Sequence, residues 1–311
     1  MAAQAPIAQA FSEHRQALWD LCYRLTGTAA DADDLVQETF ARAVSRPPRL
    51  DAPLRPWLFR VAVNLGRDLL RRRKRQPYIG PWLPSPIETG DRAEPEAPAL
   101  TPEARYGLLE SASFAFLLAI EALTPKQRAV LLLREVFDYP LRETAQALGI
   151  TENAVAVIHH RARAAMADYD RARCVPTRAL QQRTREKLEA FFGAVMTGDV
   201  SAVEALLAED VRSYSDGAGQ YTAALNPIDG AQRVSRYFLG IAGKLPQGAA
   251  VDIQLLNGLP ALVAQVPYEP GGRFSRHVVV TCDLDPSTGL IRALHVVVAD
   301  AKLSAVHFPT A

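Results

Sequence analysis

The sequence predicts a multi-domain protein in which two all-α helical domains precede an α+β domain. Three observations favour this fold class. The length of 311 residues exceeds that of a typical single domain. Apolar residues recur at helical spacing up to about residue 170, and the pattern changes past Arg178 to short helices followed by alternating segments. We therefore expect helical domains at 1–76 and 103–175, a linker at 77–102 and a third domain at 178–311.

Composition limits the range of partners. The chain has 35 Lys and Arg against 34 Asp and Glu, a net charge of +1, so any contact with nucleic acid has to be local. No apolar run approaches the roughly 20 residues needed to cross a bilayer, and the start at Met1 lacks a targeting pattern, so we expect a cytoplasmic protein without a membrane partner. Cys22, Cys174 and Cys282 are too far apart for a metal site. We expect neither a metal nor a cofactor.

The first strong helix signal follows the break at Gly27–Ala30. Asp31, Asp33 and Asp34 occupy its first turn, where the helix dipole favours carboxylates. The helix continues as LVQETFARAV, which produces an acidic outer face. The residues predicted to point inward are Val36, Phe40 and Ala43, and those predicted to point outward are Asp34, Glu38 and Arg42.

A basic helix is predicted from Trp57 to Arg75. Residues 55–75 contain eight Lys and Arg against one acid, Asp68, and such concentrated charge suits a phosphate backbone. A solvated surface helix is the alternative. The predicted apolar stripe is Leu58, Ala62, Leu65 and Leu69, and the predicted opposite face is Arg60, Asn64, Arg67, Arg71 and Lys74.

The next stretch, from Gln76 to about Pro102, is rich in proline and acids, which is typical of a linker. Within it Tyr78, Trp82 and Leu83 form an apolar knot that another part of the molecule should cover. Helical spacing resumes at about Glu103.

A helix-turn-helix is predicted further along. Leu141–Leu148 forms one helix, Gly149 allows the turn, and Thr151 caps a second helix that runs to about Met166. A buried helical hairpin is the alternative interpretation. Ala145 is small where the helices cross, and Leu148, Ile150, Val155 and Ile158 close a small core.

Past Arg178 we expect three helices, at 184–196, 201–206 and 230–242, and then four strands. Turn signals such as Asn257-Gly258 separate the strands, which predicts a curved antiparallel sheet. The predicted strands are 251–256, 259–268, 274–285 and 290–299.

These segments together resemble a known family. DADDLVQETFARAV, RPWLFRVAVNLGRDLLRRRKR and LTPKQRAVLLLREVF with TAQALGITENAVAVIHHRARAAM are similar to regions 2 and 4 of extracytoplasmic-function sigma factors of the sigma-70 family. YIGPWLPSP and the C-terminal domain resemble a subgroup with a fused SnoaL-like, NTF2-like cone. In that subgroup a WLP-type and a DGGG-type motif recur, here as Trp82-Leu83-Pro84 and Asp216-Gly217-Ala218-Gly219-Gln220; Ala218 and Gln220 depart from the usual glycine and lysine.

The resemblance implies roles for individual residues. The residues implied to contact core RNA polymerase are Asp33, Asp34, Gln37, Glu38 and Arg42. Those implied to contact the −10 promoter element are Trp57, Arg60, Asn64, Arg67, Arg71 and Lys74. Those implied to contact the −35 element are Thr151, Glu152, Asn153, His159, His160 and Arg163. Trp57 could instead anchor the core, and the two histidines could bind phosphates or face water. Interdomain contacts would involve Trp82, Leu83, Pro84, Asp216, Gly217 and Gly219, together with the Ala299–Leu303 tail.

The implied function is a promoter-specificity subunit without catalytic activity. Its partners would be core RNA polymerase and promoter DNA, and the free protein would be a monomer. The C-terminal domain would regulate the chain in cis, with its sign open, so that a separate anti-sigma factor is not required. The competing interpretation is a ligand-responsive helix-turn-helix repressor, or an enzyme that uses the pocket of the third domain. Its candidate titratable residues are Tyr214, Asp216, His277, Asp283 and His295.

Overall fold

The computed structural model describes residues 4–46, 54–90, 106–244, 248–267 and 274–310. The chain divides into two compact units. Unit 1 contains the described residues up to Pro77, 106–112 and 116–173, and unit 2 contains 78–90, 113–115 and the described residues from Cys174 onward. The acidic stretch after Gly90 and the predicted helix start at Glu103 lie outside the described residues. No helix in the described ranges is long and apolar enough to cross a membrane.

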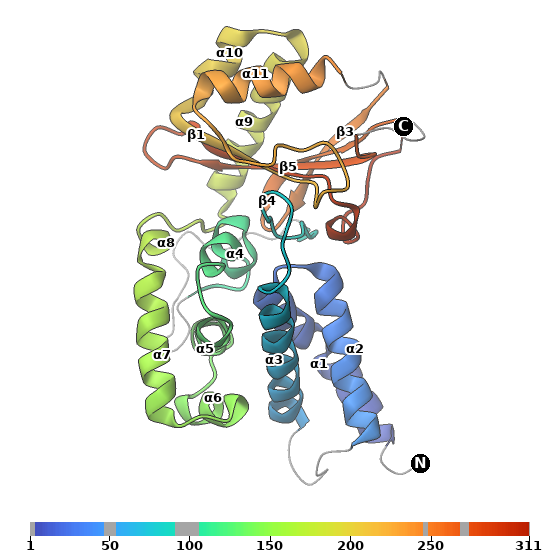
Figure 1. The fold of residues 1–311 in the computed structure, drawn as a ribbon, viewed down its shortest axis with the longest axis vertical. Coiled ribbons are helices and arrows are strands. Elements are labelled where there is room, and N and C mark those ends of the chain that lie inside the picture. Colours follow the sequence, from blue (N-terminus) through green and yellow to red (C-terminus); the bar gives the residue numbers. More distant parts are fainter. Residues whose placement is uncertain (1–3, 47–53, 91–105, 245–247, 268–273, 311) are drawn as a thin grey trace. The chain divides into compact units, whose positions relative to one another are not determined.

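Unit 1 begins with a bundle of three helices, α1 (Gln4–Thr26), α2 (Ala29–Ser45) and α3 (Leu54–Arg73) (Figure 1). Helix α2 begins at Ala29, inside the predicted break, because the Thr28 hydroxyl caps it by accepting a hydrogen bond from the Asp31 backbone N–H. Of the three acids predicted in the first turn, only Asp31 lies there. Val36, Phe40 and Ala43 are buried, as the sequence predicts.

The predicted apolar stripe of α3 is only partly right. Leu58 and Ala62 are buried, but Leu65 and Leu69 are partly exposed, and Arg67, which was predicted to face outward, is only 8% exposed. The buried face is rotated because α3 packs against α1 and α2 and also against α5 and α6. Close packing on α1 needs Gly66, where an added Cβ would collide with the Leu25 side chain.

The remainder of unit 1 is a second helical group. Its helix-turn-helix has the predicted layout: Gly149, at φ 64°, ends α6, and the Thr151 hydroxyl caps α7 by accepting from Ala154 N at 3.2 Å. Ala145 and Val155 are buried between these helices. The elements of this group are η1 (Glu110–Ala112), α4 (Phe114–Ile120), whose first two residues belong to unit 2, α5 (Pro125–Glu135), α6 (Leu141–Leu148), α7 (Glu152–Ala165) and α8 (Ala167–Arg171).

Unit 2 is an α+β domain with a six-stranded sheet in the order β2-β1-β6-β5-β4-β3. The sheet is mixed, since β1 and β6 pair in parallel, whereas the sequence predicted antiparallel pairing throughout. Strands β1 and β2 were not predicted. The elements are α9 (Arg178–Thr197), α10 (Val200–Ala205), β1 (Leu207–Asp216), β2 (Ile228–Asp229), α11 (Ala231–Ala242), β3 (Ala250–Leu256), β4 (Leu259–Gln265), β5 (His277–Leu284), β6 (Ile291–Val297) and η2 (Asp300–Lys302).

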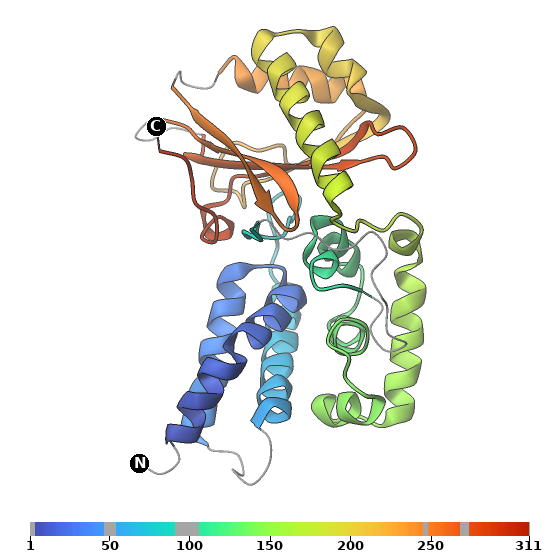
Figure 2. The same ribbon diagram turned by 180° about the vertical axis from the view of Figure 1, so that it is seen from behind.

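The three helices of unit 2 cover one face of the sheet (Figures 1 and 2). Phe191 of α9 and Phe238 of α11 pack there with Cys282 and Leu294 of the sheet. This layout confirms the expected SnoaL-like architecture. The opposite face, which we call the second face, is also buried; residues 78–89 and the tail after β6 lie on that side (Figure 1). A sheet that is buried on both faces needs two covers.

Candidate polymerase and DNA interfaces and a linker lock

The outer face of α2 carries most of the residues predicted to bind polymerase. Asp34, Gln37, Glu38 and Arg42 are exposed, and Arg42 Nε pairs with Glu38 Oε1 at 2.8 Å. Asp33 is partly buried and accepts a hydrogen bond from Trp19 Nε1 at 2.9 Å. The first four therefore form a continuous exposed strip, whereas Asp33 is held by α1.

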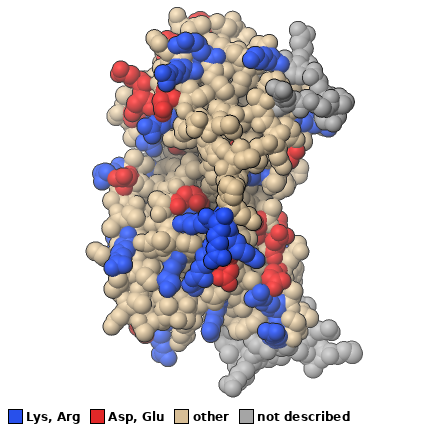
Figure 3. Space-filling view, in the orientation of Figure 1, with Lys and Arg blue, Asp and Glu red and all other residues tan. Residues whose placement is uncertain are grey.

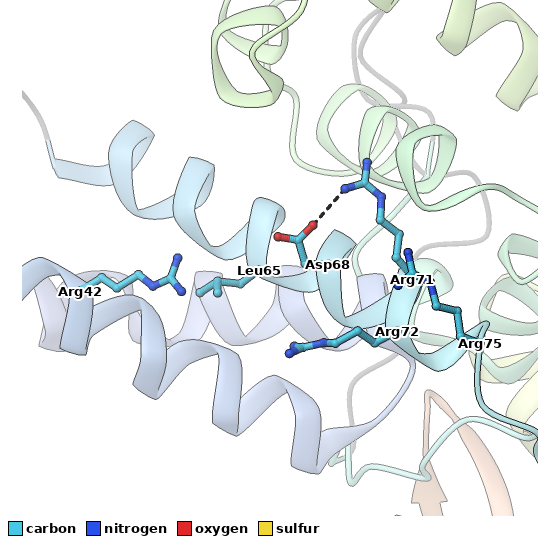
Figure 4. A pocket seen from close by; sticks show the side chains of 6 residues that line it. All are labelled: Arg42, Leu65, Asp68, Arg71, Arg72 and Arg75. Atoms are coloured by element: carbon cyan, nitrogen blue, oxygen red, sulfur yellow. Dashed lines mark hydrogen bonds and ion pairs between the residues drawn. The ribbon is translucent and has the colours of Figure 1, made fainter.

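A basic groove lies beside this strip, with a volume of about 390 Å³. It brings Arg42 of α2 together with residues of α3 and just beyond its end (Figure 4). In the space-filling view, basic side chains gather over the C-terminal half of α3, next to acidic ones over α2 (Figure 3). The groove is lined by Arg42, Leu65, Asp68, Arg71, Arg72 and Arg75.

The charges of the groove are mostly available to a partner. Arg71 pairs with Asp68 at 3.0 Å, but both side chains are more than half exposed. Among the described residues, neither Arg72 nor Arg75 forms an ion pair. The sequence indicated the basic run but not the contribution of Arg42, which only the packing of α2 against α3 brings there.

Two of the predicted −10 residues are covered within unit 1. Asn64 Nδ2 donates to the Ala147 carbonyl of α6 at 3.5 Å, and Arg67 donates to Asn64 Oδ1 at 3.0 Å. Burial, with a smaller contribution from Arg71, lowers the pKa of Arg67. The remaining predicted positions are Arg60, Arg71 and Lys74, which are exposed, and Trp57, which is partly buried.

Helix α7 presents most of the predicted −35 residues to solvent. Glu152, Asn153, His160 and Arg163 are exposed, as is Thr151 at the cap. The prediction missed Val157, which is 51% exposed on the same helix.

His159 has a different environment. Its Nε2 contacts Glu135 of α5, whose carboxylate is only 6% exposed, and Arg163 Nε lies 3.9 Å from the same carboxylate. His159 therefore fixes α7 to α5, whereas the sequence left it between phosphate contact and solvent. The sequence did not indicate that Glu135, 24 residues earlier in the chain, is the partner of His159.

The WLP and DGGG-type motifs meet in unit 2. Asp216 is completely buried at the end of β1, where its carboxylate accepts from the Tyr78 hydroxyl at 2.6 Å and from the Leu83 N–H at 2.8 Å. Lys302 Nζ lies 2.5 Å from Asp216 Oδ2 and also donates to the Leu83 carbonyl. We call Tyr78, Trp82, Leu83, Asp216 and Lys302 the linker lock.

Lys302 lies in the Ala299–Leu303 tail that the resemblance placed at this contact, but the sequence did not single out this residue. Its ammonium lies 4.4 Å from the Trp82 ring centroid and 4.9 Å from that of Tyr78, within cation–π range. Gln220 stands where the resemblance led us to expect lysine, and Lys302 supplies a cation to Asp216 from a different part of the chain. The apolar knot thus has a structural reason, because its aromatic rings cover a buried ion pair.

The turn after Asp216 fits closely against the linker. An added Cβ at Gly219 would lie 2.8 Å from Ile79 Cδ1, and Gly219 has a φ of 73°. Ala218 donates its N–H to Asp216 Oδ1 at 3.1 Å while holding a φ of 47°, a left-handed conformation that glycine adopts more easily. Gly217 is also confined, with Tyr221 O 3.0 Å from where its Cβ would be.

The linker is paired a second time further along. Ile87 and Asn257 exchange hydrogen bonds, from Ile87 N to Asn257 Oδ1 at 3.0 Å and from Asn257 N to Ile87 O at 2.9 Å. Thr89 N donates to Leu255 O at 3.1 Å. Residues 78–89 are therefore an integral part of unit 2.

Comparison with known proteins identifies two segments of the chain. Residues 10–76 match the family model described as sigma-70 region 2, and residues 113–166 match sigma-70 region 4. Over 269 residues the chain is 34% identical to the ECF RNA polymerase sigma factor SigJ of Mycobacterium tuberculosis, covering 85% of this chain and 83% of that protein. This chain belongs to the ECF family of RNA polymerase sigma factors. Members of the family are transcription initiation factors that bind core RNA polymerase and promoter DNA.

The resemblance of this sigma factor to its relatives extends beyond regions 2 and 4. SigG of M. tuberculosis is 37% identical over 287 residues, covering 84% of this chain and 68% of that protein. The crystal structure of M. tuberculosis SigJ superimposes with a TM-score of 0.72 at 28% identity, covering 97% of this chain and 100% of that one. The C-terminal domain is therefore part of the shared architecture.

Three of the five residues named for the competing enzyme interpretation, Tyr214, Asp216 and His295, have structural partners. Asp216 is held in the linker lock, and His295 is buried beneath the rings of Phe114 and Tyr214. Burial lowers the pKa of His295. In the described parts of the chain, no group of three potential metal ligands occurs.

Proposed function

We propose that this sigma factor contacts core RNA polymerase through α2, the −10 element through α3 and the −35 element through α7, and that its C-terminal domain regulates it in cis without a separate anti-sigma factor. The observation that carries the regulatory part is the burial of Asp216, which ties the linker between regions 2 and 4 to the C-terminal domain.

The polymerase interface is assigned to the exposed strip of α2. Asp34 and Glu38 are one helical turn apart and both exposed, so they can meet a basic partner together. Complementary charge would steer and orient the encounter. Val36 and Phe40, on the inward side of α2, are buried and attach the strip to the bundle.

The DNA interface combines charge on α3 with readout by α7. Arg71, Arg72 and Arg75 supply phosphate contacts that do not depend on base sequence. On α7, Asn153 can read a base edge and the exposed Val157 can contact a thymine methyl group. His159 is assigned a positioning role because Glu135 holds it.

Unit 1 is in a form that we call closed, in which α6 covers two of the residues proposed to bind the −10 element. Asn64 and Arg67 reach DNA only after α3 and α6 separate, because α6 carries the carbonyl that Asn64 now binds. A domain that holds the connecting chain can bias this separation, since docking in cis proceeds at high effective concentration. We propose that the linker lock favours the closed form.

The polymerase assignment is tested in the full-length chain. Asp34→Ala together with Glu38→Ala should weaken binding to core RNA polymerase about tenfold or more without a change in unfolding midpoint. Glu186→Ala with Glu189→Ala, two exposed acids of α9, is the matched control. Equal affinity of both double variants in a titration would remove α2 from the interface.

The regulatory assignment is tested with Trp82→Ala. Loss of the ring uncovers the ammonium of Lys302 and should loosen the linker, so that limited proteolysis cuts the 78–90 segment faster and promoter binding by the polymerase complex rises. Unaltered cleavage and unaltered promoter binding would contradict regulation through this contact.

A further inference from the structure

The second face of the sheet carries a buried aromatic site. Cys282 and Leu294 point toward the helices, so Thr281 and His295, one position away on β5 and β6, point to the second face. His295 is 2% exposed and Thr281 is 6% exposed. Helices α9 to α11 do not cover this face, so another segment must bury these side chains.

Residues 113–115 supply this cover at His295, through the side chain of Phe114. Its ring centroid lies 5.9 Å from that of His295, and Tyr214 stacks on the same imidazole with centroids 5.7 Å apart. Phe114 is itself only 5% exposed. We call the site where the Phe114 ring meets His295 and Thr281, with Tyr214 stacked on the same imidazole, the Phe114 socket.

The socket is filled. The space that remains beside Phe114 is about 10 Å³, at the limit of what one water molecule needs. The residues that line this space include Phe114, Cys174, Leu256, Asn257, Thr281 and Cys282. The Phe114 ring thus leaves almost no free space between itself and these residues.

Segments from both ends of region 4 border the socket. Phe114 is the first residue of α4, at the start of region 4, and Cys174 follows α8, just past its end. Both line the same residual space although 60 positions separate them. Beyond Cys174, the Pro176 ring lies where a Cβ on Gly258 would be, at 2.7 Å, and Gln181 Nε2 donates to Gly258 O at 2.9 Å.

The same β-turn also binds the linker. Asn257 accepts from Ile87 N, and Gly258 N donates to the Thr89 hydroxyl at 2.9 Å. The segments leading into and out of region 4 and the linker that precedes it are therefore all fixed beside one turn, Asn257–Gly258.

We propose that the C-terminal domain holds region 4 by its two ends, with Phe114 as the positioning residue seated in the socket. This role rests on the proposed cis regulation for its biological meaning, but the contact itself is tested separately. Release of Phe114 frees the start of region 4 and, because Cys174 borders the same space, loosens the segment that follows region 4 as well.

The experiment is hydrogen–deuterium exchange on full-length Phe114→Ala. Backbone amides of 113–115 and of Cys174, Val175 and Thr177, the residues of 174–177 that carry an N–H, should exchange at least tenfold faster than in the unaltered protein. Toluene should bind the space left by the phenyl ring, as small apolar molecules fill engineered cavities. At saturation it should slow exchange at both sites again and raise the unfolding midpoint by about 2–4 °C.

The control is Phe116→Ala, the same change two residues along α4. Phe116 is fully buried in unit 1 against Tyr106 and Tyr169, so its loss should destabilise unit 1 without exposing 174–177. If Phe114→Ala does not fold, Phe114→Leu, which keeps apolar volume without the ring, should show a smaller change of the same sign.

The outcomes separate the two proposals. Exchange at 174–177 that is no faster in Phe114→Ala than in Phe116→Ala overturns the socket assignment. Faster exchange that toluene reverses, with promoter binding by the polymerase complex unchanged, supports the socket and overturns cis regulation. Faster exchange accompanied by a toluene-reversible rise in promoter binding supports both.

Discussion

The basic groove of region 2 and the linker lock of the C-terminal domain both contain ion pairs, but the pairs have opposite surroundings. In the groove, the Arg71 and Asp68 side chains are 51% and 64% exposed. In the lock, Lys302 is 7% exposed and Asp216 is completely buried. Exposed pairs contribute little to folding, whereas a buried charge without its partner costs several kcal/mol.

The difference separates charges that solvent can reach from charges that the fold has paired. The Arg71 and Asp68 side chains are more than half exposed, so the groove arginines remain accessible for the phosphate contacts proposed above. The lock has satisfied Asp216 completely, with donors from two linker residues, from the turn and from the C-terminal tail. Charge alone therefore does not indicate a binding site.

The strongest change in stability should come from Asp216→Ala. It leaves the Lys302 ammonium buried without its carboxylate and removes acceptors from Tyr78 and Leu83, so the full-length chain should lose about 3–5 kcal/mol of unfolding free energy. Urea denaturation measures the change. A loss below about 1 kcal/mol would show that the lock is no stronger than an exposed pair.

A smaller effect, this time a gain in unfolding free energy, is expected at the turn that follows Asp216. Ala218→Gly relieves the left-handed conformation at φ 47°, partly offset by the freedom glycine gains in the unfolded chain, and should add about 0.5–1 kcal/mol. The unfolding midpoint of the variant in urea tests this, and Ala224→Gly serves as a control outside the lock. A destabilised Ala218→Gly would mean that the strain is absent.

At the groove we expect almost no change in stability but a clear change in binding. Arg72→Ala with Arg75→Ala should leave unfolding free energy within about 0.5 kcal/mol. It should also lower the slope of log affinity for DNA against log salt by about 2, one for each phosphate that the variant no longer neutralises. An unchanged salt slope would assign phosphate binding to other residues.

The pH dependence of His295 extends the contrast to a group that is buried without charge. Burial holds its pKa below the ordinary value of 6.5, against an opposing influence of Asp283. As the pH falls through about 6.5, His295 of the unfolded chain therefore takes up a proton before His295 of the folded chain does. The stability that is present above that pH is lost as the pH falls further. His295→Gln should flatten the fall in urea midpoint between about pH 7 and 5; an equally steep fall would exclude His295 as its source.

Most of the local structure follows from the amino-acid sequence alone. Capping by Thr151, the turn at Gly149 and the inward positions of α2 depend on residues close together in the chain, so local patterns predict them. The basic run of α3 and the resemblance to ECF sigma factors were visible for the same reason. The sequence also indicated that Trp82 and Asp216 belong to one contact, through recurrent motifs.

Which of these residues remain available to a partner depends on tertiary packing. Arg67 is buried and Asn64 is bonded because α6 packs on α3, and His159 is held by Glu135 of α5. The parallel pairing of β1 with β6 and the cover of the second face join segments far apart in sequence. Lys302 enters the lock from the C-terminal tail, 86 residues after Asp216. Local periodicity carries no information on such partners, because each depends on which distant surface removes a side chain from water.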